Sequence, residues 1–259
     1  MIDRIGDVHI AREEHVASVT IRKPPNNSVS VDLMRDLADA LEVLGKETDI
    51  RAVVLATEGK VFCAGADLSK RASEVGLDSP TSNPLYDQAV RLYAQELPIV
   101  AAIQGAAVGA GLGLALVADF RVAAPEARFA ANFTKLGFHP GFGLTYTLPR
   151  LVGRQAAAHM FLTGGRYDAS EALRIGLVDE ITDQANLLPH AHALAREIAE
   201  NAPLAIRSTR KTLRADLAAA VRVATDHEFI EQQWLMKTDD FKEGVKSVAE
   251  RRPGDFKGR

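Results

Sequence analysis

Two glycine-containing segments could each direct backbone N–H groups at a negatively charged oxygen. The first is VFCAGADLSKR, residues 61–71, and the second is AAVGAGLGLALVADF, residues 106–120. Each follows an apolar run that favours a buried strand, and glycine permits the tight turn that comes next. Backbone N–H groups at such turns can hold a phosphate or the oxyanion of a reaction intermediate. The two segments therefore suggest anion stabilisation by main-chain donors.

Nucleotide binding is one alternative for the second segment. Its glycines, Gly109, Gly111 and Gly113, follow the pattern G-x-G-x-G, whereas a dinucleotide site needs G-x-G-x-x-G. No Lys-Ser or Lys-Thr pair follows them, so the P-loop pattern fails as well. Close packing of a helix inside the core would also explain these glycines.

A membrane span is the alternative for the uncharged run between Glu96 and Asp119. The run is long enough to cross a bilayer, and three of its glycines repeat every four residues, as in membrane-helix contacts. However, Pro98 opens the run and Gln104-Gly105 interrupts it. A buried strand followed by a buried helix explains the same hydropathy, so we expect no membrane association.

Up to about residue 182 the chain alternates strand and helix patterns, which indicates an α/β fold. Apolar residues at Leu33, Leu37, Leu41 and Leu44 have helical spacing, and Ser30 precedes them as a suitable N-cap. The other predicted elements are strands at 15–25, 51–59 and 98–105, a helix at 84–97, short strands around Pro125-Glu126, a helix at 143–164 interrupted by Pro149 and Gly153, and a helix followed by a strand at 168–182.

From about Gln184 the pattern is helical without strands, with two long helices predicted at 201–214 and 217–237. The sequence thus predicts an α/β core at residues 1–183 and a C-terminal helical subdomain at residues 184–259. The apolar helix from Leu217 to Met236 has surface to bury, so we expect self-association through this subdomain.

Composition narrows the function classes. Of 259 residues, 47% are hydrophobic and 25% are charged, which is typical of a globular protein with a large core. The formal net charge of −3 gives no reason to expect nucleic-acid binding. With Cys63 as the single cysteine, we expect no metal site and a reducing, cytoplasmic location. The charged N-terminal residues also lack the apolar core of a signal peptide.

Six motifs keep a fixed order along nearly the whole chain. They are F-x-A-G-A-D-L at 62–68, the glycine run from Pro98 to Asp119, L-G-x-x-P-G at 136–141, F-L-T-G at 161–164, A-x-x-x-G-L-V-D at 172–179, and Glu243-Gly244 followed by F-x-x-R at 256–259. Together they resemble the crotonase (enoyl-CoA hydratase/isomerase) family. The resemblance implies a spiral of ββα units completed by C-terminal helices, assembled as a homotrimer or a dimer of trimers.

The resemblance implies an acyl thioester of coenzyme A as substrate, with its carbonyl oxygen held by the backbone amides of Ala66 and Ala110. Charge develops on that oxygen in an enolate or a tetrahedral intermediate, where one fixed donor contributes about 3 kcal/mol. Coenzyme A arrives with the substrate, so no separate cofactor is implied. The other residues expected to bind substrate are Ala64, Asp67, Leu68, Lys70, Gly109, Phe133, Gly141, Phe142 and Lys257, with Arg71 as a further phosphate contact and Phe138 as a further acyl contact.

The sequence departs from the family at two catalytic positions. Typical hydratases of the family carry a general-acid and a general-base glutamate at the positions that Gly113 and Phe133 occupy here. Neither residue can transfer a proton, so hydration by the usual pair is not expected. His139, in the motif loop GFHPGFG, is the replacement that the sequence suggests, because imidazole titrates near neutral pH. A loop histidine bonded to backbone or placed at a subunit contact is the alternative.

Two functions of different classes fit these observations. The first is an acyl-CoA-processing enzyme that hydrates, isomerises or hydrolyses its substrate through an oxyanion or enolate. The second is a non-catalytic acyl-CoA-binding protein or scaffold. The missing glutamates favour this function, whereas the two retained glycine turns that would hold the oxyanion argue against it.

Overall fold

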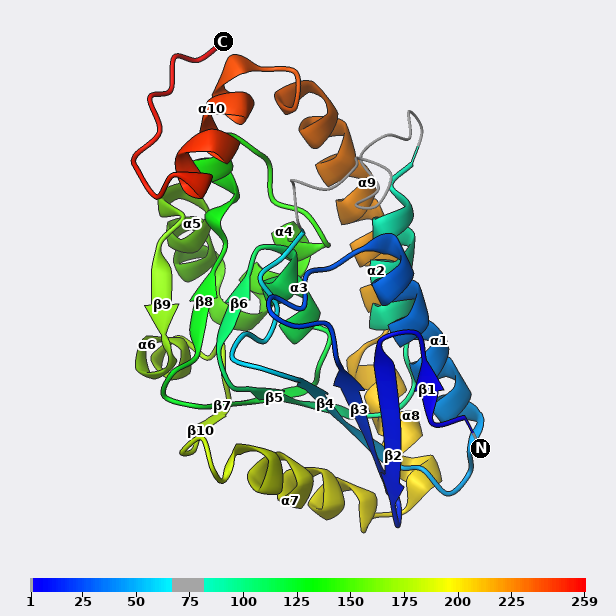
Figure 1. Ribbon diagram of the computed structural model, residues 1–259. Coiled ribbons are helices and arrows are strands. Elements are labelled where there is room, and N and C mark those ends of the chain that lie inside the picture. Colours follow the sequence, from blue (N-terminus) through cyan, green and yellow to red (C-terminus); the bar gives the residue numbers. More distant parts are fainter. Residues whose placement is uncertain (1, 67–81) are drawn as a thin grey trace.

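The computed structural model describes residues 2–66 and 82–259 as an α/β fold with two sheets (Figure 1). Strands of the larger sheet lie in the order β1-β2-β3-β4-β5-β7-β10, and those of the smaller sheet in the order β6-β8-β9. The three N-terminal strands pair antiparallel, and from β3 onward the larger sheet is parallel. The strands are β1 Arg4–Ile5, β2 Val8–Glu13, β3 Val16–Ile21, β4 Ala52–Thr57, β5 Ile99–Ile103, β6 Ala106–Val108, β7 Phe120–Ala123, β8 Arg128–Ala130, β9 Arg166–Asp168 and β10 Glu180–Ile181.

The larger sheet is covered on both faces, which explains why its central strands are apolar throughout. In β4, Val53 and Leu55 face one core with helix α1, whereas Val54 and Ala56 face a second core with helix α7. Ser30 begins α1 by accepting a hydrogen bond from Leu33 N at 3.2 Å, as the sequence predicts. The helices are α1 Val31–Lys46, α2 Pro84–Tyr93, α3 Ala110–Ala115, α4 Leu144–Val152, α5 Arg154–Thr163, α6 Ala169–Arg174, α7 Leu187–Ala199, α8 Pro203–Leu213, α9 Leu217–Leu235 and α10 Asp239–Ala249, with a 3₁₀ helix at Asn132–Leu136.

The segment from Pro98 to Asp119 is not one membrane-length helix. It forms β5, the short strand β6 and the buried helix α3, and within the described ranges no helix is long and apolar enough to cross a membrane. Strand β6, which the sequence did not predict, belongs to the smaller sheet and pairs with β8. Gln104-Gly105 is therefore the point at which the chain passes from one sheet to the other.

The C-terminal helices pack on the elements that surround the glycine segments. Helix α9 contacts α2 and α4, and α10 contacts the 3₁₀ helix (Figure 1). The predicted break at Gly153 separates α4 from α5, whereas Pro149 lies inside α4 without ending it. The boundary predicted at residues 183 and 184 stays a prediction.

Candidate active site

A cavity of about 370 Å³ lies where the two glycine segments meet the 3₁₀ helix and α10. Its wall is mostly apolar and comes from parts of the chain that are far apart in sequence. The described residues that line it are Asn26, Ser28, Ala64, Gly65, Ala66, Asn83, Leu85, Tyr86, Val108, Gly109, Ala110, Asn132, Phe133, Leu136, Phe138, Gly141, Phe142, Gln232, Val245, Val248 and Ala249.

Backbone hydrogen bonds fix the first glycine turn against the second. Cys63 N donates to Ala106 O at 2.9 Å, and Val108 N donates to Cys63 O at 3.0 Å. Gly65 has a φ of +87°, and a Cβ built on it would lie 2.7 Å from Val108 O and 3.6 Å from Ala110 N. A side chain at position 65 is therefore excluded, and the turn that carries Ala66 lies directly against the start of α3.

Ala110 is the first residue of α3, so its N–H has no acceptor inside that helix. Gly109 precedes it with φ +56° and ψ −122°, a conformation that side chains rarely adopt. Both alanines line the cavity, and Ala110 is buried. The structure thus brings the residues predicted as oxyanion donors to one cavity wall.

Two phenylalanines fill the space around the positions where the resemblance implies glutamates. A Cβ built at Gly113 would lie only 2.6 Å from Cδ1 of Phe142, so the Phe142 ring occupies the volume that a side chain at 113 would need. Phe142 is fully buried and has a φ of +64°. The Phe133 ring lies beside Gly109, with Cζ 3.7 Å from a Cβ built there. This end of the cavity is therefore mainly apolar, with Oδ1 of Asn132 as a polar neighbour 3.8 Å from the Cβ built at Gly109.

Among the described residues that line the cavity, Tyr86 is the single titratable side chain. Its hydroxyl donates to Oε1 of Gln232 at 2.6 Å, and burial raises the pKa of Tyr86 above its usual value. Tyr86 therefore stays protonated near neutral pH and cannot serve as a general base. The remaining polar groups in the lining are amides and one hydroxyl.

His139 lines a second cavity, of about 610 Å³, together with Thr145, Phe161 and Trp234. Phe138 lines both cavities and so stands in the wall between them. The Nδ1 atom of His139 lies 2.8 Å from Pro140 O, and a carbonyl oxygen can only accept, so Nδ1 donates. The structure does not bring His139 to the cavity of Ala66 and Ala110. Its catalytic role stays a prediction, which the position of the ring does not support.

The other predicted site residues divide into three groups. Ala64, Gly109, Phe133, Gly141 and Phe142 line the cavity of Ala66 and Ala110, and their contact with substrate stays a prediction. Lys257 lies on the C-terminal segment, where its Nζ pairs with Asp255 at 2.7 Å and its N donates to Asp240 at 2.6 Å. The predictions for Asp67, Leu68, Lys70 and Arg71 lie outside the described residues.

Several lining residues gave no signal in the sequence. Asn26 and Ser28 come from the loop after β3, Asn132 begins the 3₁₀ helix, and Gln232 lies on α9. None of these residues belongs to a sequence motif or to a regular spacing of similar residues. Only the folded arrangement brings them together.

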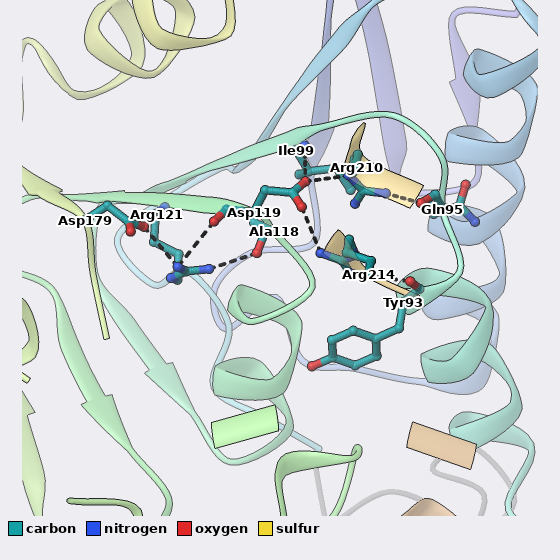
Figure 2. A network of polar contacts seen from close by, with 9 residues as sticks. All are labelled: Tyr93, Gln95, Ile99, Ala118, Asp119, Arg121, Asp179, Arg210 and Arg214. Atoms are coloured by element: carbon teal, nitrogen blue, oxygen red, sulfur yellow. Dashed lines mark hydrogen bonds and ion pairs between the residues drawn. The ribbon is translucent and has the colours of Figure 1, made fainter. Parts of the chain in front are cut away.

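A polar network holds the end of α3 that lies away from Ala110 (Figure 2). The Asp119 carboxylate accepts from Ile99 N at 2.9 Å, from Arg210 Nε at 2.9 Å and from Arg214 Nη1 at 3.0 Å. Arg121 donates to the carbonyl oxygens of Leu177 and Ala118, each at 2.8 Å, and pairs with Asp179 at 3.0 Å. The loop after α3 is thus fixed to β5 and to the C-terminal helices.

A buried carboxylate lies behind Phe142. Glu228 of α9 accepts hydrogen bonds from Gly143 N at 2.8 Å, Thr145 N at 2.9 Å and the Thr145 hydroxyl at 2.6 Å. These donors belong to the start of α4, where a negative charge is favourable. Burial nevertheless raises the pKa of Glu228 to about 7, so its charge changes near neutral pH.

Comparison with known proteins places this arrangement in a family. Residues 11–259 match the model of the enoyl-CoA hydratase/isomerase family. The Bacillus subtilis protein YngF, whose name carries a provisional enoyl-CoA hydratase/isomerase assignment, is 37% identical over 254 residues, which cover 95% of this chain and 96% of YngF. The 2,3-dehydroadipyl-CoA hydratase of Escherichia coli is 32% identical over 256 residues, covering 98% of this chain and 100% of that protein.

The fold agrees with solved structures of the same family. The crystal structure of an enoyl-CoA hydratase/isomerase from Pseudoalteromonas atlantica superposes with a TM-score of 0.87 at 29% identity, covering 97% of this chain and 100% of that chain. The family and fold predicted from the six motifs are thereby confirmed. The chain therefore belongs to the enoyl-CoA hydratase/isomerase family and is an acyl-CoA-processing enzyme.

Proposed function

We propose that the enzyme binds an acyl-CoA with its thioester oxygen between the backbone amides of Ala66 and Ala110 and stabilises the charge that forms there. The main support is the contact of the two glycine turns, in which a Cβ at Gly65 would lie 3.6 Å from Ala110 N. Two fixed donors in an apolar cavity stabilise an enolate or tetrahedral oxyanion more than mobile water does.

Glutamate-assisted hydration is not the reaction that we propose. Gly113 and Phe133 supply no proton-transfer group, and Phe142 fills the space beside Gly113. Because the burial-raised pKa of Tyr86 keeps its hydroxyl protonated, that residue gives no base either. We infer that main-chain stabilisation of the thioester oxyanion is the catalytic contribution of this cavity, in an isomerisation or a hydrolysis whose proton is moved by a group outside the described lining.

We further propose that the acyl group is apolar. Phe133, Phe138, Phe142, Val245 and Val248 line the cavity, and its described lining contains no charged side chain. A carboxylate on the far end of the acyl chain would lose its water there without gaining a cationic partner. Hexanoyl-CoA should therefore bind more tightly than adipyl-CoA, which has the same chain length and a terminal carboxylate.

Ala110→Pro tests the oxyanion assignment because proline removes the N–H of residue 110. Proline is tolerated in the first turn of a helix, and circular dichroism would establish that the variant is folded. We expect turnover of every acyl-CoA in a panel to fall by a factor of about 10² or more. Unchanged turnover in the folded variant would refute the assignment.

A non-catalytic acyl-CoA-binding role is the second candidate, favoured by the lack of a general base in the described lining of the cavity. Titration calorimetry and turnover with the same thioester panel separate the two. Binding without turnover of any thioester would establish the second candidate. Turnover that is lost in Ala110→Pro would establish the first.

A further inference from the structure

The polar network beside α3 holds more positive than negative charge (Figure 2). Its guanidinium groups are those of Arg121, Arg210 and Arg214, and its carboxylates are those of Asp119 and Asp179. The side chains of Arg121 and Arg210 are only 4% and 8% exposed. Burial lowers the pKa of both groups, which means that the carboxylates do not fully replace the water that the cations lost.

Two donors of this network have no acceptor. Within the described residues, Nη2 of Arg210 and Nε of Arg214 are buried without a hydrogen-bond partner. A buried cationic N–H without an acceptor costs more than a neutral one, so such groups usually meet a counter-ion or ordered water. The network is therefore short of one anionic or neutral acceptor group.

A cavity of about 220 Å³ adjoins the network at Arg214, whereas Arg210 does not line it. Arg121, Arg150 and Arg214 line it, together with Asp119, Tyr93 and Thr147. Arg150 is exposed. Its Nη1 lies 3.4 Å from the Tyr146 hydroxyl and its Cζ lies 5.5 Å from the centre of the Tyr146 ring, and both contacts restrain it only weakly. Arg150 can therefore turn toward a bound group while Arg214 stays fixed on Asp119.

We propose that this cavity is a binding site for a small dianionic oxyanion of the phosphate class, held between Arg150 and Arg214. Three cations and one carboxylate among the described lining residues leave two positive charges, which a dianion balances. The guanidinium group suits this ligand because its planar N–H donors match a pair of phosphate oxygens.

Free phosphate, rather than a phosphate of coenzyme A, is the occupant that the structure favours. Among the described residues, this cavity and the cavity of Ala66 and Ala110 share no lining residue. The site is therefore independent of the proposed oxyanion function, and a failure of one proposal leaves the other standing.

Calorimetric titration of the wild-type protein with inorganic phosphate, at an ionic strength fixed with sodium chloride, tests the proposal. We expect saturable binding of one phosphate per chain, displaced by sulfate and not by acetate. Arg150→Gln should weaken the affinity at least tenfold, because it removes one of the two clamping cations and leaves the buried network intact. Arg154→Gln is the matched control, since Arg154 is exposed on the next helix and does not line the 220 Å³ cavity.

Four results would overturn the proposal. They are absent or non-saturable phosphate binding, equal affinities for wild type and Arg150→Gln, equal losses in Arg150→Gln and Arg154→Gln, and displacement of phosphate by coenzyme A but not by dephospho-coenzyme A. The last result would assign the cations to the substrate's 3′-phosphate. Arg214→Gln, checked for folding by circular dichroism, is the second variant and should weaken phosphate binding as well.

Discussion

Phe142 combines complete burial with a left-handed backbone, and the resulting strain is tolerated where its ring fills the space beside Gly113. A non-glycine residue at positive φ persists only when its surroundings hold it in place. Here the Glu228 carboxylate accepts a hydrogen bond from N of the next residue, Gly143, and the Phe142 ring gives the cavity wall an apolar surface. At the scale of single residues, the Phe142 ring therefore serves as packing in the space beside Gly113.

Gly113→Ala should lower the free energy of unfolding by about 1–3 kcal/mol, because the added methyl group overlaps the Phe142 ring. Urea denaturation measures this loss. The double variant Gly113→Ala/Phe142→Gly should lose less stability than the sum of the two single variants, since the two residues compete for one volume. Additive losses would show that they do not.

His139→Ala should leave kcat within a few-fold of wild type, because the ring lies in the second cavity and its Nδ1–H is bonded to Pro140 O. Steady-state kinetics across pH 6 to 8 would check this, since a catalytic histidine titrates in that range. A fall in kcat of about 10²–10⁴ would restore the role that the sequence suggested.

At the scale of elements, Asp119 lies in the loop after α3 and connects it to both β5 and α8. Asp119→Asn should lower the unfolding free energy by about 3–5 kcal/mol, because it leaves Arg210 and Arg214 without their buried counter-charge. Urea denaturation would measure the change. Asp179→Asn is the control, and its loss should be smaller because Asp179 is one third exposed.

Glu228 connects α9 to α4 and should make stability depend on pH. Its pKa is about 7 in the folded protein and near 4.5 in an unfolded chain, so the folded state binds the proton more tightly. The contribution of Glu228 is fully present below pH 4.5 and is lost as pH rises through 7, on the order of 3 kcal/mol in total.

Glu228→Gln should therefore flatten this part of the profile of unfolding free energy against pH, whatever its effect on absolute stability. Urea denaturation at half-unit pH steps between 4.5 and 8 measures the slope. A slope identical to that of wild type would show that Glu228 does not titrate in this range.

At this scale, the sequence predicted the elements that carry a long apolar pattern. Ser30 and its leucine ladder predicted α1, and uninterrupted apolar runs predicted β4 and β5. Strand β6 has three residues, too few for a pattern, and lies next to another apolar strand. The loop from Phe138 to Phe142 has no periodicity, so the sequence could not indicate that His139 and Phe142 face different cavities.

At the scale of the whole molecule, exposed apolar side chains lie on α9 and α5. Ile230 and Trp234 on α9 are 61% and 54% exposed, and Leu162 on α5 is 78% exposed. Leu162 and Trp234 line the same cavity. A patch of this kind usually marks a contact with another protein, and we propose that it joins copies of this chain.

Light scattering after gel filtration should give a mass of three or six chains of 27.9 kDa each. The double variant Ile230→Lys/Trp234→Glu should shift the mass toward one chain, because it places charges in the contact. A wild-type protein that elutes as a monomer at micromolar concentration would contradict the proposal.

The reactivity of the Cys63 thiol can report how often the contact between the two glycine segments opens. Its thiol is fully buried, and burial raises the pKa of Cys63 to about 11, so a thiol reagent can attack only after the surrounding segment has separated. Its backbone is bonded to both Ala106 and Val108. As the sequence has a single cysteine, the rate of labelling in native buffer would measure how often this wall of the cavity opens locally, and a ligand held there should slow it.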